Sequence, residues 1–344
     1  MPIVRSYGNA FEVVDRTDNL LEIPNNWNLF DALNLFTEQS VTSPTLTLEK
    51  IVESGGVLLD SVRGTRHMQN KDYTRELRSF VIPHFTLDDY ITPEDIQGKR
   101  AYGSEQVETL DAVRMRKLER IRRAHDWTRE IARAQLITAG TVYSPNGTTG
   151  TQNYFTEFSI TQKTVDFVFG TSTTDIRGKI EEVIAHIQDN VLNAGVYENI
   201  IAVCSPTWFK ALINHATVVD AYNSYASEAE PLRKRLNAPG LDARFRSFSH
   251  AGITFIEYRG SLGGTTLVTA NRAYAFPVRV PDLFETYYAP AGKFDLVNTL
   301  GEKMYAFEYR DPRGEKHEIQ TETNFINVLR RPNCIVELTS STGL

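Results

Sequence analysis

The pattern of apolar and polar residues divides the chain into segments of different character. Residues 1–48 carry their apolar side chains in small islands between polar turn formers. Such a segment can hardly form a hydrophobic core alone, so it is either a tether with a frayed end or an arm that lies across another surface. Its apolar cluster favours an arm that docks on the body of the same chain or on a neighbouring molecule. The cluster includes Trp27, Phe30, Leu33 and Phe36.

Residues 45–92 alternate in the manner of β-strands. TLTLEKIV and GGVLLDSV run toward a polar tip, and YTRELRSFVIPHFTLDDYI runs back. A two-stranded ribbon alone buries nothing on one of its faces. The pattern therefore predicts either a projecting ribbon with a partner surface or two strands of an ordinary sheet. The tip, residues 63–78, has five basic and two acidic residues, the basic ones being Arg63, Arg66, Lys71, Arg75 and Arg78.

Residues 105–138 contain no Pro or Gly and predict one helix, with Ser104 as its N-cap and Gly140 beyond its end. At 1.5 Å per residue such a helix spans about 50 Å. Residues 114–133 include eight basic and three acidic side chains. These residues form either a face of the helix that binds nucleic acid or a solvent-exposed side with ion pairs four residues apart, such as Glu119–Arg123.

Near residue 199 the pattern of apolar and polar residues changes to one typical of short alternating strands and helices. This change predicts a second unit over 199–291. NIIAVC, ITFIEY, TLVTA and AYAFPV are typical of strands, and Ser205-Pro206 is typical of a helix start. Asn146-Gly147 predicts a hairpin turn. After Gly292 the pattern is extended again through KMYAFEYR, EKHEIQTETN and CIVELT.

Composition narrows the class of protein. The 344 residues are 41% hydrophobic and 23% charged, a globular balance that argues against a disordered chain. The net charge of −6 argues against a protein whose main task is wrapping nucleic acid. We expect no membrane span, because no long uncharged apolar window occurs, and no secretory signal. Cys204 and Cys334 are expected to be reduced small hydrophobes.

The residue patterns support no catalytic chemistry. Cys204, His215 and Asp220 offer a thiol, a base and an orienting acid only superficially, because Cys204 ends an apolar strand. The seven histidines show no metal-ligand spacing, and the glycine-rich run at 260–264 lacks a P-loop lysine. We therefore expect a protein that is not an enzyme and needs no cofactor or metal.

Several ordered motifs resemble the major capsid proteins of lambda-like tailed phages, the capsid protein E family. They are IPHF and ITPEDIQGKRAYG before the long helix, then ANRAYAFP, VPDLFETYYAPAG, VNTLG and the ending NVLRRPNCIVELTSS. The resemblance implies an α+β fold of the Hong Kong 97 type. Its expected parts are an N-terminal arm (1–47), an extended loop (48–92), a peripheral domain (93–198) with spine helix 105–138, an axial domain (199–291) and return strands (292–344).

The resemblance also implies a function. The chain is expected to assemble with itself into pentamers and hexamers of an icosahedral head around double-stranded DNA, with a scaffolding protein, a portal and a decoration protein as partners. It would be made in the host cytoplasm and end in the virion. Trp27, Phe30, Leu33, Phe36, Arg63, Arg66, Arg75 and Arg78 are the subunit-interface candidates, and Arg116, Arg120 and Arg123 the DNA-facing ones.

Two other functions stay open at this point. An encapsulin-type shell of a cellular compartment has the same fold, and a hydrolase with Cys204 as nucleophile is the alternative from another class. Some relatives of the fold join subunits by a lysine–asparagine cross-link, for which Lys71 with Asn324, Asn327 or Asn333 would be the residues. Lambda-like members generally rely on decoration proteins instead, so no cross-link is expected.

Overall fold

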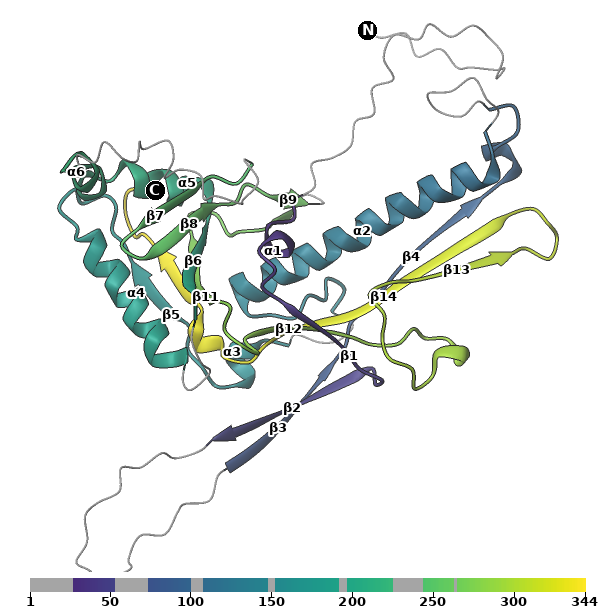
Figure 1. Ribbon diagram of the computed structural model, residues 1–344, viewed down its shortest axis with the longest axis horizontal. Coiled ribbons are helices and arrows are strands. Elements are labelled where there is room, and N and C mark those ends of the chain that lie inside the picture. The colour runs from purple at the N-terminus through teal and green to yellow at the C-terminus, as the bar shows by residue number, and fades with distance from the viewer. Residues whose placement is uncertain are drawn as a thin grey trace, which may run out of the picture.

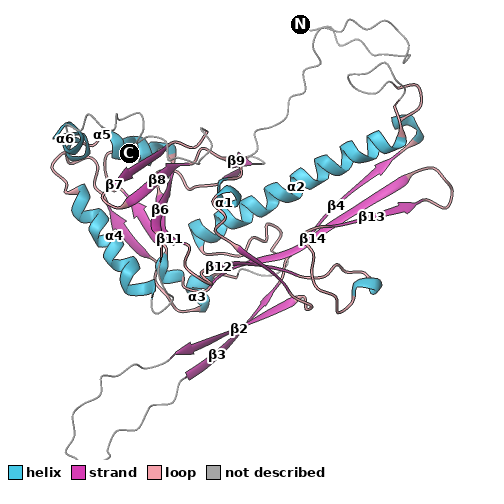
Figure 2. Cartoon of the chain, in the orientation of Figure 1, coloured by secondary structure: helices cyan, strands magenta, loops and turns pink. Residues whose placement is uncertain are grey.

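The chain folds into two differently shaped sheets with helices and a projecting ribbon (Figures 1 and 2). The computed structural model describes residues 27–52, 74–99, 108–147, 152–191, 197–224, 244–262 and 265–344. Expectations on Arg63, Arg66 and Lys71 lie outside these residues, as do those on most of the arm.

A long sheet is organised around β14 (His317–Leu329). The second half of β14 pairs with β12 (Phe284–Tyr288), which pairs in turn with β1 (Thr37–Ser40). The first half lies between β13 (Tyr305–Arg310) and β4 (His84–Ile91). A strand of this length joins both halves of the sheet into one extended body, seen in yellow in Figure 1.

The long helix, α2 (Leu110–Ala139), runs along this sheet (Figure 1). Val113 and Ile121 of α2 pack with Ile91 of β4 and Ile319 of β14 in a small apolar cluster. His125 of α2 is buried, and its Nε2 lies 2.9 Å from Thr321 Oγ1. These contacts on one side of α2 hold the helix to the strands.

The helix begins later than predicted. Thr109 has an extended backbone, and its Oγ1 accepts a hydrogen bond from Ala112 N at 3.3 Å, so Thr109 is the N-cap instead of Ser104. The other end agrees with the prediction, because Gly140 has the left-handed φ of 63° that a side chain would disfavour.

The second sheet has six strands. The helices beside it are α4 (Ile176–Val191), α5 (Pro206–Asn214) and α6 (Ala216–Ser224). Trp208 of α5 is fully buried and packs edge-on against Phe167 and Phe169. The strand order is β5 (Lys163–Asp166), β15 (Val336–Thr339), β11 (Ala273–Val278), β6 (Asn199–Cys204), β8 (Ile253–Glu257) and β7 (Ser247–His250).

The two sheets exchange segments across the expected domain boundaries at 199 and 292. β5 precedes residue 199 and β15 follows residue 292, yet both belong to the six-stranded sheet. Conversely, β12 falls inside 199–291 but pairs with β14 in the long sheet. Division by sheet therefore differs from division by sequence order.

The ribbon is formed by β2 (Thr45–Val52) and β3 (Thr74–Val81), which in the described residues pair only with each other. It ends at Val81 and not at 92, because Ile82-Pro83 interrupts the strand and β4 joins the long sheet. Leu46 and Phe80 are buried against the body, whereas Leu77 is 68% exposed.

The remaining elements are short, and one differs from the predictions. The expected turn lies at Ser144–Gly147, and the described residues on its two sides, which exclude 148–151, form one bridge, Thr141 with Asn153. In TLVTA, Leu267 and Val268 are buried but lie outside any strand. The short elements are α1 (Leu29–Ala32), α3 (Tyr154–Glu157), η1 (Pro93–Asp95), β9 (Ser261–Leu262), β10 (Thr265–Thr266), η2 (Phe294–Leu296) and η3 (Pro332–Cys334).

Candidate assembly site

The base of the arm, residues 27–40, packs on the body of its own chain. Phe30 is fully buried with its ring 5.6 Å from that of Tyr258. Phe36 is 5% exposed and contacts Phe284, with ring centroids 5.3 Å apart. Trp27 and Leu33 are half-buried against the same core.

This packing bears on the interface candidates Trp27, Phe30, Leu33 and Phe36. Phe30 and Phe36 are already buried within the chain, whereas Trp27 and Leu33 are half-buried against the same core and stay candidates for contact with a neighbouring subunit. The physical reason is that apolar faces of α2 and of the strands lie within reach of this segment, and burial there stabilises the fold at once. The cluster did need a surface, as the sequence indicated, and that surface is intramolecular.

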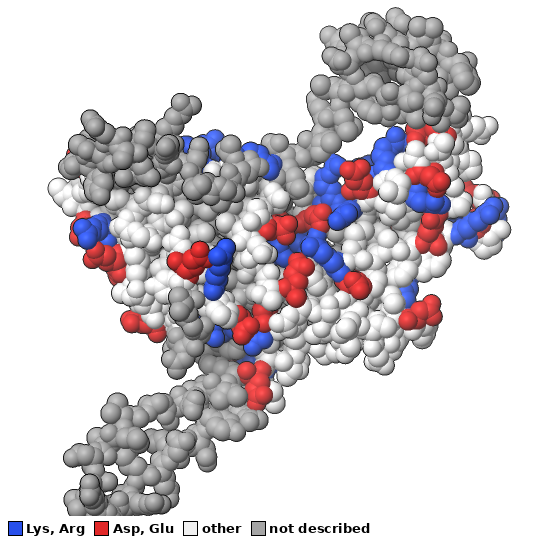
Figure 3. All heavy atoms as spheres, in the orientation of Figure 1, with Lys and Arg blue, Asp and Glu red and all other residues white. Residues whose placement is uncertain are grey.

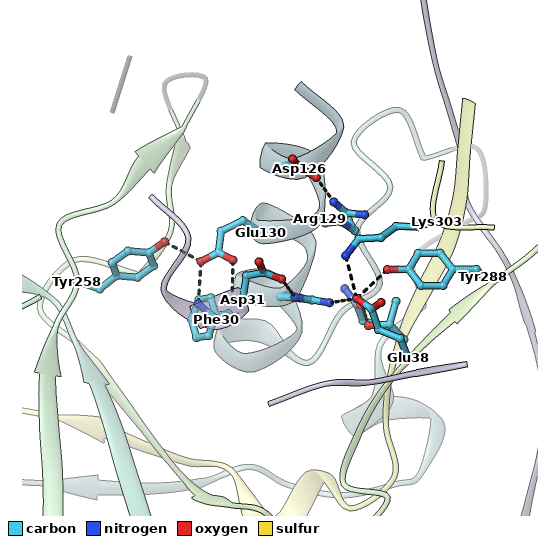
Figure 4. Close-up of polar contacts among 12 residues, drawn as sticks. Phe30, Asp31, Glu38, Asp126, Arg129, Glu130, Tyr258, Tyr288 and Lys303 are labelled. Atoms are coloured by element: carbon cyan, nitrogen blue, oxygen red, sulfur yellow. Dashed lines mark hydrogen bonds and ion pairs between the residues drawn. The ribbon is translucent and has the colours of Figure 1, made fainter. Parts of the chain in front are cut away.

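Glu130 of α2 anchors the short helix α1 from outside (Figure 4). Its Oε1 accepts hydrogen bonds from Phe30 N at 2.9 Å and Tyr258 Oη at 2.8 Å, and its Oε2 accepts one from Asp31 N at 3.3 Å. The first N–H groups of a helix have no partner within the helix. One carboxylate thus satisfies two of them and connects the arm base to α2 and to Tyr258, beyond β8.

The burial of Glu130 has an electrostatic consequence. Burial raises the pKa of the carboxyl group to about 7, although the N–H of Phe30, the hydroxyl of Tyr258 and the charge of Arg133 act in the opposite direction. The anchor therefore titrates near neutral pH, whereas an exposed glutamate is fully ionised there.

Arg133 is the second anchor, one turn further along α2. Its Nη1 donates to Asp31 Oδ1 at 2.8 Å and its Nη2 donates to Glu38 Oε1 at 3.1 Å. The guanidinium also lies over the ring of Phe36, 4.9 Å from its centroid. One buried arginine thereby holds the arm base at both ends of residues 31–38.

Glu38 connects the same cluster to the long sheet. Its Oε1 accepts hydrogen bonds from Tyr288 Oη at 3.1 Å and from Lys303 Nζ at 3.4 Å. Burial opposes ionisation of this carboxyl group, but Lys303, Tyr288 and Arg133 together lower its pKa. Arm, helix and sheet therefore meet in one network of charges (Figure 4).

Sequence reasoning did not single out Glu130 or Glu38, and it counted Arg133 only as part of a basic run. A charged residue in an amphipathic helix normally faces solvent. One signal was available: Ala132, Ala134, Leu136 and Ile137 surround these positions, and so much apolar sequence indicates a buried helix end. It did not indicate that the arm would be the partner.

Most of the basic residues of α2 are engaged within the chain. Arg114 pairs with Glu308 at 2.7 Å, and Lys117 pairs with Asp89 at 3.2 Å. Arg116, a DNA-facing candidate, pairs with Glu108 at 3.2 Å. Acids elsewhere in the chain thus neutralise much of the run, and Figure 3 shows both signs of charge interspersed over this face.

The other two DNA-facing candidates differ from Arg116. Among the residues that the structure describes, Arg120 and Arg123 form no ion pair; Arg120 is exposed and Arg123 is half-buried. With Arg116 they lie at three-to-four spacing along one stripe of α2. The structure thus brings the three candidates together on one side of the helix.

Of the basic ribbon candidates, the structure describes only part. Arg78 lies in β3 opposite Leu48 and is exposed, and the backbone of Arg75 lies in the same strand opposite Ile51. The side chain of Arg75 is outside the described residues. Among the asparagines considered for a cross-link, Asn324 and Asn327 are buried in β14, and the Oδ1 of Asn327 accepts from Thr286 Oγ1.

The candidate catalytic residues do not form a site. Cys204 is fully buried, which raises the pKa of its thiol well above the usual value, and its Sγ contacts Ala202 O. The His215 ring contacts Thr171 O and Thr217 Oγ1 instead of the thiol. Asp220 is exposed on α6. The three side chains therefore lack the contacts that nucleophilic catalysis needs.

The described residues also bear on metal binding and on membrane insertion. Across the described ranges, no three His, Cys, Asp or Glu side chains gather closely enough to hold a metal ion. None of the helices within the same ranges combines the length and apolar character that a membrane crossing requires.

The fold matches solved capsid structures. The capsid protein of cyanophage P-SCSP1u superimposes with a TM-score of 0.59 at 13% sequence identity, covering 97% of this chain and 94% of that one. An encapsulin of Synechococcus elongatus PCC 7942 superimposes with a TM-score of 0.51 at 10% identity, covering 96% of each chain. The predicted α+β fold of the Hong Kong 97 type is therefore confirmed.

Sequence comparison then identifies the family. The profile of the phage major capsid protein E family matches residues 13–340. The major capsid protein of Pseudomonas phage KPP10 is 48% identical, and the alignment covers 97% of this chain and 98% of that protein. The chain belongs to the phage major capsid protein E family.

Proposed function

We propose that this protein is the structural subunit of a phage head shell and assembles with itself into pentamers and hexamers of an icosahedral shell around double-stranded DNA. The observation that carries the proposal, beyond family membership, is the ribbon. In the described residues β2 and β3 pair only with each other, and Leu77 and Val81 stay exposed on them. A ribbon of this kind is stabilised when its open face meets a neighbouring subunit.

Affinity would come from many modest contacts repeated over a closed shell. The tip arginines Arg63, Arg66, Arg75 and Arg78 would dock on acidic patches of the next subunit, including its acidic arm. The arm base is attached to its own α2 by Glu130 and Arg133 and would take no part in this docking.

The stripe Arg116, Arg120 and Arg123 would face the packaged DNA and contact its phosphates without reading sequence. A scaffolding protein, a portal and a decoration protein would complete the assembly, which starts in the host cytoplasm and ends in the virion. The chain would act as a structural protein and not as an enzyme, consistent with the buried, poorly ionised thiol of Cys204.

The direct test is negative-stain electron microscopy and sedimentation of the purified full chain. Uniform polyhedral shells, tubes or isolated hexamers support the proposal. Monomers only, across protein concentrations and in the presence of cell extract from the infected host, contradict it. Shells purified from cells with protein cargo and no nucleic acid would favour the encapsulin alternative, which the shared fold supports.

A second test addresses the ribbon tip. Arg63→Glu with Arg66→Glu is expected to block shell assembly and to leave the monomer folded, because the change reverses charge at the docking end. Arg177→Glu with Lys210→Glu makes the same change in net charge on α4 and α5 and serves as the control. A normal particle yield from the tip variant, measured by sedimentation, contradicts docking through these arginines.

A further inference from the structure

The loop after β12 presents an apolar ridge that the fold itself does not use. Phe294 is 99% exposed, Leu300 is 63% exposed and Val297 is 61% exposed. They follow one another at intervals of three residues in and after η2. Single exposed apolar residues are common on protein surfaces, but three on one short loop indicate an interaction site.

The ridge is held in place and does not hang freely. At its start, Lys293 Nζ donates to Gln320 Oε1 of β14 at 2.9 Å. At its end, Gly301 N donates to Val41 O at 3.1 Å, and Gly301 approaches Tyr288 O so closely that a Cβ would have no room. A loop that is fixed at both ends loses little entropy when a partner covers it.

A groove of about 720 Å³ offers apolar surface beside polar and charged side chains, among them Glu49 and Arg331. It lies between the ribbon base and the segments around α3 and η3, and its apolar lining residues are Leu46, Leu48, Phe158, Ile160 and Pro332. Arg331 lines it as well, donates to Pro281 O and forms no ion pair in the described part of the chain. Asp295, beside Phe294 on the ridge, is exposed and likewise forms no ion pair there.

We infer that the ridge and the groove are the two halves of one contact between two copies of this chain, with Phe294, Val297 and Leu300 entering the groove and Asp295 meeting Arg331. This inference rests on the proposed self-assembly. The lining of the groove includes none of the three ridge residues, so a subunit does not fill its own groove with its ridge.

The contact has a consequence for the architecture. Because two different surfaces meet, it is a head-to-tail contact, and repetition of such a contact closes into a ring when the rotation allows. Ring closure is what a pentamer or hexamer needs. The ribbon base forms one wall of the groove, so filling the groove also buttresses the ribbon from the body side.

The first experiment removes the ridge. The triple variant Phe294→Ser, Val297→Ser and Leu300→Ser is expected to lower the assembled fraction at least about tenfold in sedimentation velocity, with the thermal unfolding of the monomer unchanged. The control triple, Met115→Ser, Val219→Ser and Leu344→Ser, also replaces exposed apolar residues and is expected to assemble normally. Normal assembly of the ridge variant overturns the inference.

The second experiment tests the pairing itself. Val297→Cys combined with Ile160→Cys is expected to produce, on oxidation of assembled particles, a ladder of linked chains up to the ring size on non-reducing gels. Each single cysteine variant is the control, and the native Cys204 and Cys334 are buried. Shells that form without any ladder overturn the ridge–groove pairing. Failure of the wild-type chain to assemble at all contradicts the proposed function instead.

Discussion

The arm base and the ribbon both carry apolar side chains without a core of their own, but they differ in what covers those side chains. The arm base is attached to α2 through the buried Glu130 and Arg133 and through Phe30. The ribbon pairs with itself and keeps Leu77 68% exposed. One segment completes the fold of its own chain, and the other remains available to a neighbour.

The difference shows where stability and assembly are separated in this molecule. Substitutions in the arm base should act on the monomer, because its contacts exist before any shell forms. Substitutions on the open face of the ribbon should act on assembly, because the monomer gains nothing from that face.

Phe30→Ala is expected to have the largest effect on the monomer. The side chain is fully buried, and its removal should lower the free energy of unfolding by about 3–5 kcal/mol, measured by chemical denaturation. Phe294→Ala makes the same change at a 99% exposed position and should alter that free energy by less than about 0.5 kcal/mol. Equal effects of the two substitutions would contradict the burial of the arm base.

Glu130→Gln should change how monomer stability depends on pH. The folded pKa of about 7 lies above the usual 4.5, so the contribution of this group is complete below pH 4.5 and is lost as the pH rises through 7. From pH 5 to pH 8 the wild-type chain should therefore lose about 1–3 kcal/mol more free energy of unfolding than the variant.

The comparison with the variant isolates Glu130 from nearby His125. Burial and the charge of Arg129 lower the pKa of His125 and outweigh the opposite effect of Asp126. The folded protein therefore loses stability through His125 as the pH falls below 6.5, the pKa of an unperturbed histidine. This effect is common to both proteins and cancels in the difference. Parallel curves of unfolding free energy against pH would show that Glu130 is not the titrating anchor.

Leu77→Ser with Val81→Ser should separate assembly from folding. Both side chains are exposed, so the free energy of unfolding of the monomer should change by less than about 0.5 kcal/mol. The yield of particles in sedimentation should fall severalfold. Leu87→Ser with Tyr309→Ser, exposed positions of the long sheet, provides the control and should assemble normally. A destabilised monomer would mean that the ribbon face is already used within the chain.

Arg116→Ala, Arg120→Ala and Arg123→Ala together should act mainly on DNA binding. In the described residues the variant loses one ion pair, that of Arg116 with the buried Glu108, so some loss of monomer stability is expected beside the effect on DNA. For DNA binding by assembled shells or hexamers, the slope of log affinity against log salt should become shallower by about 2–3. Fluorescence anisotropy with a labelled duplex measures this slope. Arg177→Ala on α4 is the control, and an unchanged slope in the triple variant would remove the stripe from the DNA-facing surface.

Local pattern determined many of the elements of this protein. Alternation predicted β13 and β14, the apolar run at 199–204 predicted β6, and Ser205-Pro206 marked the start of α5. Gly140 marked the end of α2 because a left-handed C-terminal position favours glycine. The ordered motifs indicated the family, and with it the fold, since they resemble its members along nearly the whole chain.

Tertiary structure alone decided the partners. Phe30 and Glu130 are 100 residues apart, and β5 pairs with β15 across 173 residues, for example Lys163 with Val336. An amphipathic pattern shows that one face is apolar but does not show which distant surface will cover it. For the same reason the sequence determined that the arm base needed a surface, and only the three-dimensional packing decided that the surface was its own α2 and not a neighbour.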